Sequence, residues 1–350
     1  MANSIFDYVK NAEVLQYARR LNPEIFFGLQ LFRPRTVLEL SYEYLKEVGG
    51  TKASMMAELV AWEAAAPLAP HEALAQVEGE LPPIKTKRRF SEKEIINIFG
   101  PRATSQRTEA INKLYRDIVS VVDGVHSRLN WIIMQSLAYS TVTFTGAGVK
   151  LSVDWGIPAN QINDDLTGTT LWSDHDDSDP VANIQAMQTT ILDATGILPD
   201  AAITSNTIIS HLLQNENIKK AMFGSTETSR ILTIDALNNF FVSIGLPELY
   251  SYDERVKTVS SADYKTVTTG RFYPETRFTM FPRGEVLGET LYGPTAEGIR
   301  ALALEEAPGI YAQIFETIDP VNVFTYAVAT AFITFPGVDF TGIIIPLTEA

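Results

Sequence analysis

The most closely spaced residues with metal-binding chemistry are the aspartates between Asp174 and Asp179, in the run Asp-His-Asp-Asp-Ser-Asp. Carboxylates at this spacing suit a hard cation such as Ca²⁺, but the run lacks the glycine and the distal glutamate of an EF-hand loop. Pro180 follows directly, and an aspartate before a proline at the start of a helical pattern is a typical N-cap. The sequence therefore favours a linker and a helix cap over a metal site.

The four histidines form no recognisable catalytic or metal-binding motif. His71, His126, His175 and His211 lie far apart, and none has the spacing of an H-E-x-x-H pair. The chain also lacks a G-x-S-x-G nucleophile elbow, a Walker loop and a G-x-G-x-x-G turn. It has no cysteine, which excludes disulfides, thiolate metal sites and cysteine nucleophiles. We therefore predict no catalytic residue, no cofactor and no bound metal.

One basic cluster, formed by Lys85, Lys87, Arg88 and Arg89, interrupts an acidic chain. The formal net charge is −14, and residues 151–270 alone hold 16 Asp and Glu against 6 Lys and Arg. Such a surface repels nucleic acid, because phosphate binding needs clustered cations. Two interpretations of the basic cluster stay open. It pairs with an acidic surface of a neighbouring subunit, or it is a solvated basic edge that discourages wrong strand pairing.

The composition predicts a folded, soluble chain with more than one module. Its 350 residues are 45% hydrophobic and 20% charged, which is typical of globular proteins. The longest apolar stretches, such as Val321–Phe335, are too short and too often interrupted to span a bilayer. The first twenty residues do not resemble a secretory signal. We expect no membrane partner.

The clearest secondary-structure element predicted by the sequence is a long amphipathic helix. Between Thr104 and Leu137, apolar side chains recur every third or fourth position, and Thr104 or Ser105 can cap the start. The apolar positions are Ile111, Leu114, Tyr115, Ile118, Val121, Val122, Val125, Leu129, Ile132, Ile133 and Leu137. At about 1.5 Å per residue the helix would be roughly 50 Å long. Gly124 inside it permits a bend or a close contact.

Two extended segments are predicted to leave the body of the protein and return. Residues 37–44 alternate as a strand does, and residues 79–90 are again extended in character. The sequence between them is rich in Ala, Pro and Glu. An exposed two-stranded hairpin is marginally stable by itself. We therefore expect the excursion over about residues 38–90 to need a partner surface.

The remaining chain predicts a mixed α+β protein. Two alternating runs flank Gly146-Ala-Gly148, which indicates a hairpin over residues 141–156. A loop leads to Pro180, and residues 181–196 and 205–223 have helical character with a strand between them. Mixed strands and turns are expected over about residues 231–318, followed by a long β run. Periodicity alone thus gives an α+β class with one long helix and an exposed hairpin.

The order of these parts resembles the lambda-like major capsid proteins of tailed bacteriophages, the capsid protein E family. The residues that carry the resemblance are Leu31-Phe-Arg33, the Lys-Arg-Arg return at 87–89, Val153-Asp-Trp-Gly156, Trp172 followed by Asp179-Pro180, and Thr204-Ser-Asn. Each motif is short, and their order and spacing from about residue 25 to the C-terminus carry the resemblance.

The resemblance implies the tailed-phage major capsid protein fold. Its parts would be an N-terminal arm (1–28), an extended E-loop with flanks (29–95), a P-domain (96–179, with spine helix 104–137 and hairpin 141–156), an A-domain (180–318), and a P-domain C-terminal strand and tail (319–350). The E-loop would lie over a neighbouring subunit. The A-domain would meet its copies around fivefold and sixfold axes.

The function implied by the resemblance is self-assembly into the icosahedral capsid that encloses the double-stranded DNA of a phage. The partners would be many copies of the chain in pentamers and hexamers, with portal, scaffolding and decoration proteins. The DNA would be enclosed without specific binding. Lys85, Lys87, Arg88 and Arg89 would be assembly contacts. The capsid would assemble in the host bacterial cytoplasm, and a separate scaffold is expected because the fold starts almost at Met1.

Three alternatives remain at the level of sequence. A nanocompartment shell protein on the same fold would enclose cargo instead of DNA, and a phage tail or neck protein would form tubes or rings. An acidic hydrolase of unknown family would stay a small oligomer. The missing catalytic motif and the long exposed excursion argue against the hydrolase.

Overall fold

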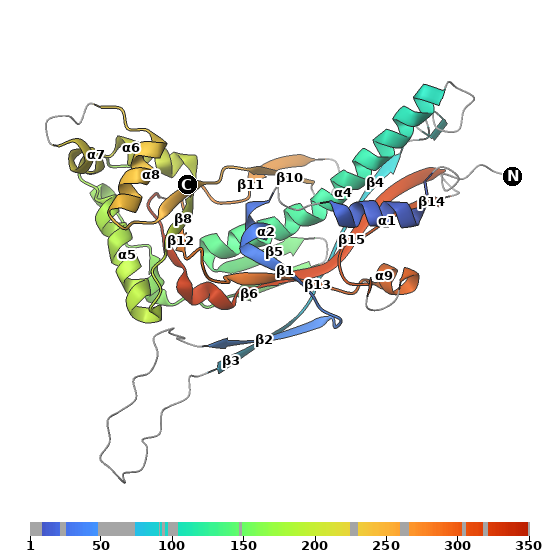
Figure 1. Ribbon diagram of the computed structural model, residues 1–350, viewed down its shortest axis with the longest axis horizontal. Helices are drawn as coiled ribbons and strands as arrows, with labels where there is room; N and C mark the ends of the chain where they lie inside the picture. The colour runs from blue at the N-terminus through green and yellow to red at the C-terminus, as the bar shows by residue number, and fades with distance from the viewer. Residues whose placement is uncertain are drawn as a thin grey trace, which may run out of the picture. The chain divides into compact units, whose positions relative to one another are not determined.

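The computed structural model describes residues 9–21, 26–47, 74–90, 92, 95–96, 104–146, 149–224, 230–259, 266–302, 306–317 and 321–348. The chain divides into two compact units. Unit 1 comprises Met1–Tyr44, Glu78–Ile133 and Gly288–Thr334, and unit 2 comprises Leu45–Val77, Met134–Leu287 and Phe335–Ala350. Each unit is assembled from segments that lie far apart in sequence (Figure 1).

Unit 1 is built on one five-stranded sheet. Its strands are β1 (Phe32–Thr36), β4 (Pro83–Phe90), β13 (Gly288–Gly293), β14 (Tyr311–Thr317) and β15 (Asn322–Thr334). β15 is 13 residues long, is largely buried, and pairs antiparallel with β4, β13 and β14, whereas β1 pairs parallel with β13. Its sequence is rich in β-branched and aromatic residues, which favour a strand with neighbours on both edges. The predicted long β run is therefore confirmed as the organising strand of unit 1.

Helices cover this sheet. They are α1 (Asn11–Arg20), α2 (Phe27–Leu31), α4 (Thr104–Tyr139) and α9 (Ala296–Ala301). The predicted long helix is α4, and its periodic positions from Leu114 to Ile133 contribute much of the buried core of unit 1. The Asn11 side chain accepts a hydrogen bond from the Ile314 backbone N–H at 2.9 Å, which ties α1 to β14. The Asn130 side chain likewise accepts from the Gly28 N–H at 3.0 Å.

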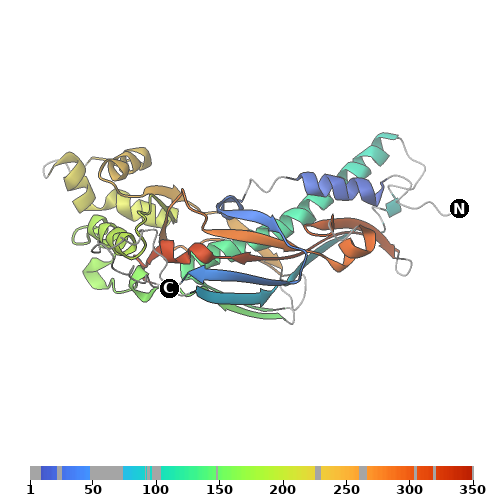
Figure 2. The ribbon, with the colours of Figure 1, turned by 60° about the horizontal axis from the view of Figure 1, so that its bottom comes forward.

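The predicted excursion contains a two-stranded ribbon of β2 (Ser41–Glu47) and β3 (Leu74–Glu80). The two strands lie side by side in both views (Figure 1, Figure 2). A hydrogen bond of 2.9 Å from the Leu81 N–H to the Leu40 carbonyl closes the base. Among the described residues the ribbon pairs with no other strand. The Ala-, Pro- and Glu-rich middle of the excursion lies outside the described residues.

Unit 2 combines a sheet of short strands with four helices. The strands, in sheet order, are β7 (Ile162–Asn163), β16 (Gly342–Ile344), β12 (Phe278–Phe281), β8 (Ala201–Thr204) and β9 (Glu248–Ser251). The helices are α5 (Pro180–Thr195), α6 (Asn206–Gln214), α7 (Glu216–Phe223) and α8 (Ile234–Ser243). Their buried apolar side chains form one cluster with β8, β9, β12 and β16, and it includes Trp172, Phe241 and Phe278. This cluster is the core of unit 2.

Two hairpins complete unit 2. One is the predicted hairpin, β5 (Thr141–Gly146) with β6 (Val149–Asp154), whose turn residues 147–148 lie outside the described residues. It follows Ser140, which ends α4 in a left-handed conformation with φ of 55°. The buried Trp155 donates its indole N–H to Ser136 at 2.9 Å and so ties the hairpin to the last turns of α4. The other hairpin is β10 (Arg255–Val259) with β11 (Val267–Arg271).

The structure corrects the predictions in two places. The segment 205–223 is two helices instead of one, because Asn215 has an extended backbone (φ −60°, ψ 126°) and its side chain caps α7 by accepting from the Ile218 N–H at 3.0 Å. The segment 231–318 was expected to hold only strands and turns, but it contains α8 and α9, each capped by a threonine side chain. No helix in the described residues has both the length and the hydropathy that a membrane span requires.

The boundaries of unit 1 and unit 2 also differ from those of the predicted domains. β13 and β14 lie in the segment 180–318 that was assigned to the A-domain, yet both pair with β15 and belong to unit 1. Such long-range pairing cannot be read from local periodicity. The domain names themselves stay a prediction.

Candidate assembly surface

β4 places the four predicted contact residues on two different faces of the unit 1 sheet. Because side chains alternate along a strand, Lys85, Lys87 and Arg89 point to one face, and Arg88 points to the other with Thr86. The face of Thr86 and Arg88 is covered by α4, since the Thr86 methyl lies 3.5 Å from where a Cβ would stand on Gly124. We call the other face, which carries Lys85, Lys87 and Arg89, the outer face.

The outer face combines cationic and aromatic side chains. Lys85 lies opposite Val328, and Lys87 and Arg89 lie opposite Tyr326 and Phe324 of β15. The Lys87 ammonium is 5.5 Å from the centre of the Phe324 ring, which is within cation–π range. Phe315 of β14 stacks on Phe324, with ring centroids 5.0 Å apart. These aromatic rings are only partly buried, so the outer face offers amphipathic surface to a partner.

Glu297 of α9 neutralises one end of the outer face. Its carboxylate lies 3.5 Å from the Lys85 ammonium and accepts a hydrogen bond of 2.9 Å from the Tyr326 hydroxyl. Burial raises the pKa of Glu297, but its own backbone N–H, Tyr326 and Lys85 together outweigh burial and hold that pKa below its ordinary value. Burial and the neighbouring Glu297 raise the pKa of Tyr326. The tyrosine therefore acts as a hydrogen-bond donor at physiological pH.

Arg88 has a partner on the α4 side. Its guanidinium lies 3.2 Å from the Asp117 carboxylate of α4. Lys85 and Arg88 were predicted as contacts to a neighbouring subunit, and both have acidic partners within their own chain. Such exposed ion pairs typically contribute about 0–1 kcal/mol. Among the described residues Arg89 has no ion pair.

The base of the excursion adds a feature that the sequence analysis missed. Leu38 is 53% exposed and Leu40 is 50% exposed. A shallow depression of about 700 Å³ lies there, lined by Glu39, Leu40, Ser41, Gly79 and Glu80. The two exposed leucines give the base of the excursion an apolar surface beside this depression. The only sequence signal was the pair of leucines on either side of Glu39.

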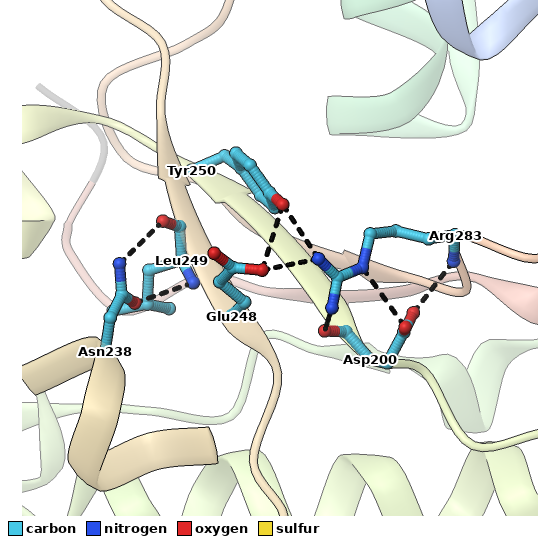
Figure 3. Close-up of polar contacts among 6 residues, drawn as sticks. All are labelled: Asp200, Asn238, Glu248, Leu249, Tyr250 and Arg283. Carbon is cyan, nitrogen blue, oxygen red and sulfur yellow. Dashed lines mark hydrogen bonds and ion pairs between the residues drawn. The ribbon is translucent and has the colours of Figure 1, made fainter.

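A polar network holds the turn after β12 against β8 and β9 in unit 2 (Figure 3). Arg283 donates from its backbone N–H to Asp200 at 2.8 Å, from Nε to the same carboxylate at 3.1 Å, and from Nη1 to Tyr250 at 2.9 Å and to Glu248. Burial lowers the pKa of Arg283, but the bonds to Asp200 and Glu248 outweigh it and raise the pKa. Since every group in this network is engaged, it fixes a turn and offers no free nucleophile.

The aspartate run forms the predicted turn and helix cap. The Asp174 carboxylate accepts hydrogen bonds from the backbone N–H groups of Asp176 and Asp177, at 3.2 and 3.1 Å. Asp179 caps α5 by accepting from the Ala182 N–H at 3.0 Å. The N-cap prediction is therefore confirmed. Within the described ranges no group of three or more potential metal ligands comes together.

Two of the histidines meet, which the sequence analysis did not foresee. His175 Nε2 and His211 Nδ1 are 2.9 Å apart, although the residues are 36 positions apart in sequence. Burial and the neighbouring His175 lower the pKa of His211. His126 is buried in α4, and burial lowers its pKa to about 4, so it is neutral at pH 7. His71 lies outside the described residues.

Comparisons with known proteins agree with this architecture. The model of the family phage major capsid protein E matches residues 22–333. A phage-related protein from Bordetella bronchiseptica superposes with a TM-score of 0.56 at 11% identity, covering 97% of this chain and 98% of that chain. A protein provisionally assigned as the capsid protein of a prophage of Escherichia coli CFT073 superposes with a TM-score of 0.62 at 13% identity, covering 96% and 99%.

These structural similarities confirm the predicted fold class, and at such low identity they speak for the fold alone. No curated protein sequence matches this chain. The family model carries the assignment, since it spans most of the chain, including β4 with the basic cluster and the larger part of each unit. The chain belongs to the phage major capsid protein E family.

Proposed function

We propose that many copies of this chain assemble, as pentamers and hexamers, into the icosahedral shell that encloses the double-stranded DNA of a tailed phage. The observation that carries the proposal is the family match over residues 22–333. The role is structural. Heterologous contacts between copies that nearly close into rings, with small changes of curvature, are sufficient to tile a closed shell.

The β2–β3 ribbon is the part of the chain that most needs a neighbour. Among the described residues its two strands pair only with each other, and an isolated two-stranded hairpin is marginally stable. We therefore assign it as the E-loop that lies over an adjacent subunit. Its exposed leucines at the base, Leu38 and Leu40, would add apolar area to that contact.

The outer face of the unit 1 sheet is the surface we assign to receive a neighbouring subunit. Lys87, Arg89 and the half-buried rings of Phe315 and Phe324 give it both charge and apolar area. Aromatic residues and arginine are enriched at protein interfaces. Lys85 and Arg88, by contrast, would contribute mainly by orienting Glu297 and Asp117 of their own chain.

The remaining assignments follow from the same proposal. α4 would be the spine helix of the P-domain, and unit 2 would contain most of the A-domain. Portal, scaffolding and decoration proteins would be the other partners, with assembly in the host bacterial cytoplasm and a final location in the virion. By sequence, unit 2 holds 24 Asp and Glu against 12 Lys and Arg. This charge supports enclosure of DNA without specific binding.

A precise shortening of the excursion tests the proposal. Replacing residues 48–73 by a short Gly-Ser linker removes the middle of the excursion but keeps β2, β3 and β4, so the unit 1 sheet is retained. Sedimentation velocity and negative-stain microscopy of the full chain should show rings of five and six or closed shells, and the shortened chain should show far fewer. Equal assembly of the full and the shortened chain would refute the E-loop assignment, and a full-length chain that remains a monomer or a small dimer even with a phage scaffolding protein present would refute the proposed shell.

A further inference from the structure

The β10–β11 hairpin is a second ribbon without a partner strand in the described part of the chain. Its register runs from Arg255 opposite Arg271 to Val259 opposite Val267. Thr258 and Thr268 share a hydrogen bond of 2.9 Å between their hydroxyl groups. Residues on β10 alternate between half-buried and exposed, and four of the five on β11 are exposed. Most of this ribbon therefore faces solvent in the single chain.

One face of this ribbon is cationic with an apolar end. Arg255, Lys257 and Val259 share this face, because they alternate along β10, and they lie opposite Arg271, Thr269 and Val267. Val259 is 54% exposed and Val267 is 56% exposed. We call this the ribbon face. The two strands contain no carboxylate.

The charges of the ribbon face are only partly compensated within the chain. Arg271 forms ion pairs with Asp253 and, at 3.2 Å, with Glu275. Neither Arg255 nor Lys257 forms an ion pair within the residues that the structure describes. Arg255 also lies directly opposite another arginine, and like charges in opposing positions destabilise a strand pair. An external anionic surface would therefore stabilise this end of the ribbon.

The rest of unit 2 has the complementary charge. Unit 2 as a whole holds 24 Asp and Glu against 12 Lys and Arg, and its exposed carboxylates outside the ribbon include Asp176, Asp177 and Asp193. An assembly of identical chains brings together many copies of both the acidic surface and the ribbon face, so a partner of complementary charge is available in every copy. The exposed valine pair favours a protein surface over nucleic acid, which would need more clustered cations and no apolar end.

We propose that the ribbon face docks on the acidic surface of unit 2 of a second copy of this chain. This inference rests on the proposed shell function and adds a charge-complementary contact to it. Electrostatic complementarity steers association and fixes orientation. The contact should therefore weaken as added salt screens the charges.

Charge reversal tests this contact. The variant Arg255→Glu/Lys257→Glu should need about tenfold more protein to assemble than the wild type, measured by sedimentation at low salt. The control Lys150→Glu/Arg300→Glu makes the same change of net charge at two exposed positions outside the ribbon and should assemble as the wild type does. Circular dichroism of both variants should show the wild-type fold.

Zero-length carbodiimide cross-linking supplies a second readout. In particles assembled from a mixture of ¹⁴N- and ¹⁵N-labelled chains, Lys257 should be joined to aspartate or glutamate residues of unit 2 in mixed-isotope pairs. Normal assembly of the Arg255→Glu/Lys257→Glu variant, together with wild-type particles in which Lys257 is cross-linked only within its own chain, would overturn the inference and leave the shell proposal intact. Normal assembly with loss of DNA retention would overturn it in favour of nucleic acid. A wild-type chain that never assembles would overturn both proposals.

Discussion

Unit 1 and unit 2 differ in how they form a core and in the charge that they carry. Unit 1 has a 13-residue central strand, β15, that pairs with three others. The strands of the main sheet in unit 2 have two to four residues, and its core combines buried side chains of capped helices with those of strands and loops. By sequence, unit 1 has 16 Lys and Arg against 18 Asp and Glu, whereas unit 2 has 12 against 24.

This difference in charge indicates that cationic and acidic surfaces of the capsid subunit have different roles in contacts between copies. Two strongly acidic surfaces repel each other, so contacts between copies need cationic surface from elsewhere. The outer face of unit 1 and the ribbon face of unit 2 both offer it, through Lys87, Arg89, Arg255 and Lys257. In the proposed shell, the acidic remainder of unit 2 would receive such surfaces and would leave enclosed DNA unbound.

Substitutions in β15 should destabilise the core of unit 1 most. Phe332 is buried, and Phe332→Ala should destabilise the subunit by about 3–5 kcal/mol because it leaves a cavity under the sheet. Urea denaturation of the unassembled subunit measures the loss. Val321, which is exposed beside the same strand, serves as the control, and Val321→Ala should change stability little. Equal effects of the two substitutions would contradict a core organised by β15.

The buried histidine of α4 should make stability depend on pH. Burial lowers the pKa of folded His126 to about 4 from its ordinary 6.5, so between these values the unfolded chain binds more protons than the folded chain. The contribution is therefore fully present above about pH 6.5 and is lost as the pH falls, by up to about 3 kcal/mol. His126→Leu should flatten this part of the pH profile. The half-buried His211 should give a smaller effect of the same sign, and identical profiles for wild type and His126→Leu would be the contrary result.

The stability of the junction between α6 and α7 should depend on the side chain of Asn215. The buried Asn215 caps α7 and donates to the Ser178 carbonyl and hydroxyl at 3.1 and 2.9 Å. Asn215→Ala should therefore cost about 2 kcal/mol in thermal or urea unfolding. The control Asn206→Ala lies on exposed surface at the start of α6 and should be nearly neutral. A comparable loss in both variants would mean that the cap contributes nothing specific.

A glycine in unit 1 offers a stabilising change. A Cβ on Gly124 would make ordinary contact with Thr86 at 3.5 Å, so Gly124→Ala should raise stability by about 1 kcal/mol through helix propensity. The contrasting variant is Gly288→Ala, whose Cβ would stand 2.2 Å from the Phe32 ring and 2.3 Å from the Thr334 carbonyl oxygen. That variant should be destabilised. A loss of stability in Gly124→Ala would show that α4 and β4 are packed more tightly than described.

Elements with strong local periodicity could be predicted from the sequence. The repeat of apolar residues gave α4 to within two residues, and Asp179-Pro180 gave the start of α5. α6 and α7 were merged because Asn215 acts through its side chain, which a hydrophobic pattern does not register. α8 was missed because its polar and aromatic residues are mixed over only ten positions.

The surfaces were harder to predict than the elements. The basic cluster is contiguous in sequence, but β4 divides it between two faces because successive side chains alternate. Phe315 and Phe324 join it only through the pairing of β14, β15 and β4, and such contacts depend on the whole sheet. The meeting of His175 and His211 likewise depends on the turn formed by Asp174. The sequence thus predicted which segments are acidic or basic, but it did not predict which side chains contact one another.

The proposed shell can be seen in a cryo-electron microscopy reconstruction of particles assembled from the full chain. We expect closed shells with icosahedral symmetry, built from rings of five and six, in which each β2–β3 ribbon lies on a neighbouring subunit. Tubes, a single small ring, or shells in which every ribbon folds back on its own chain would contradict it.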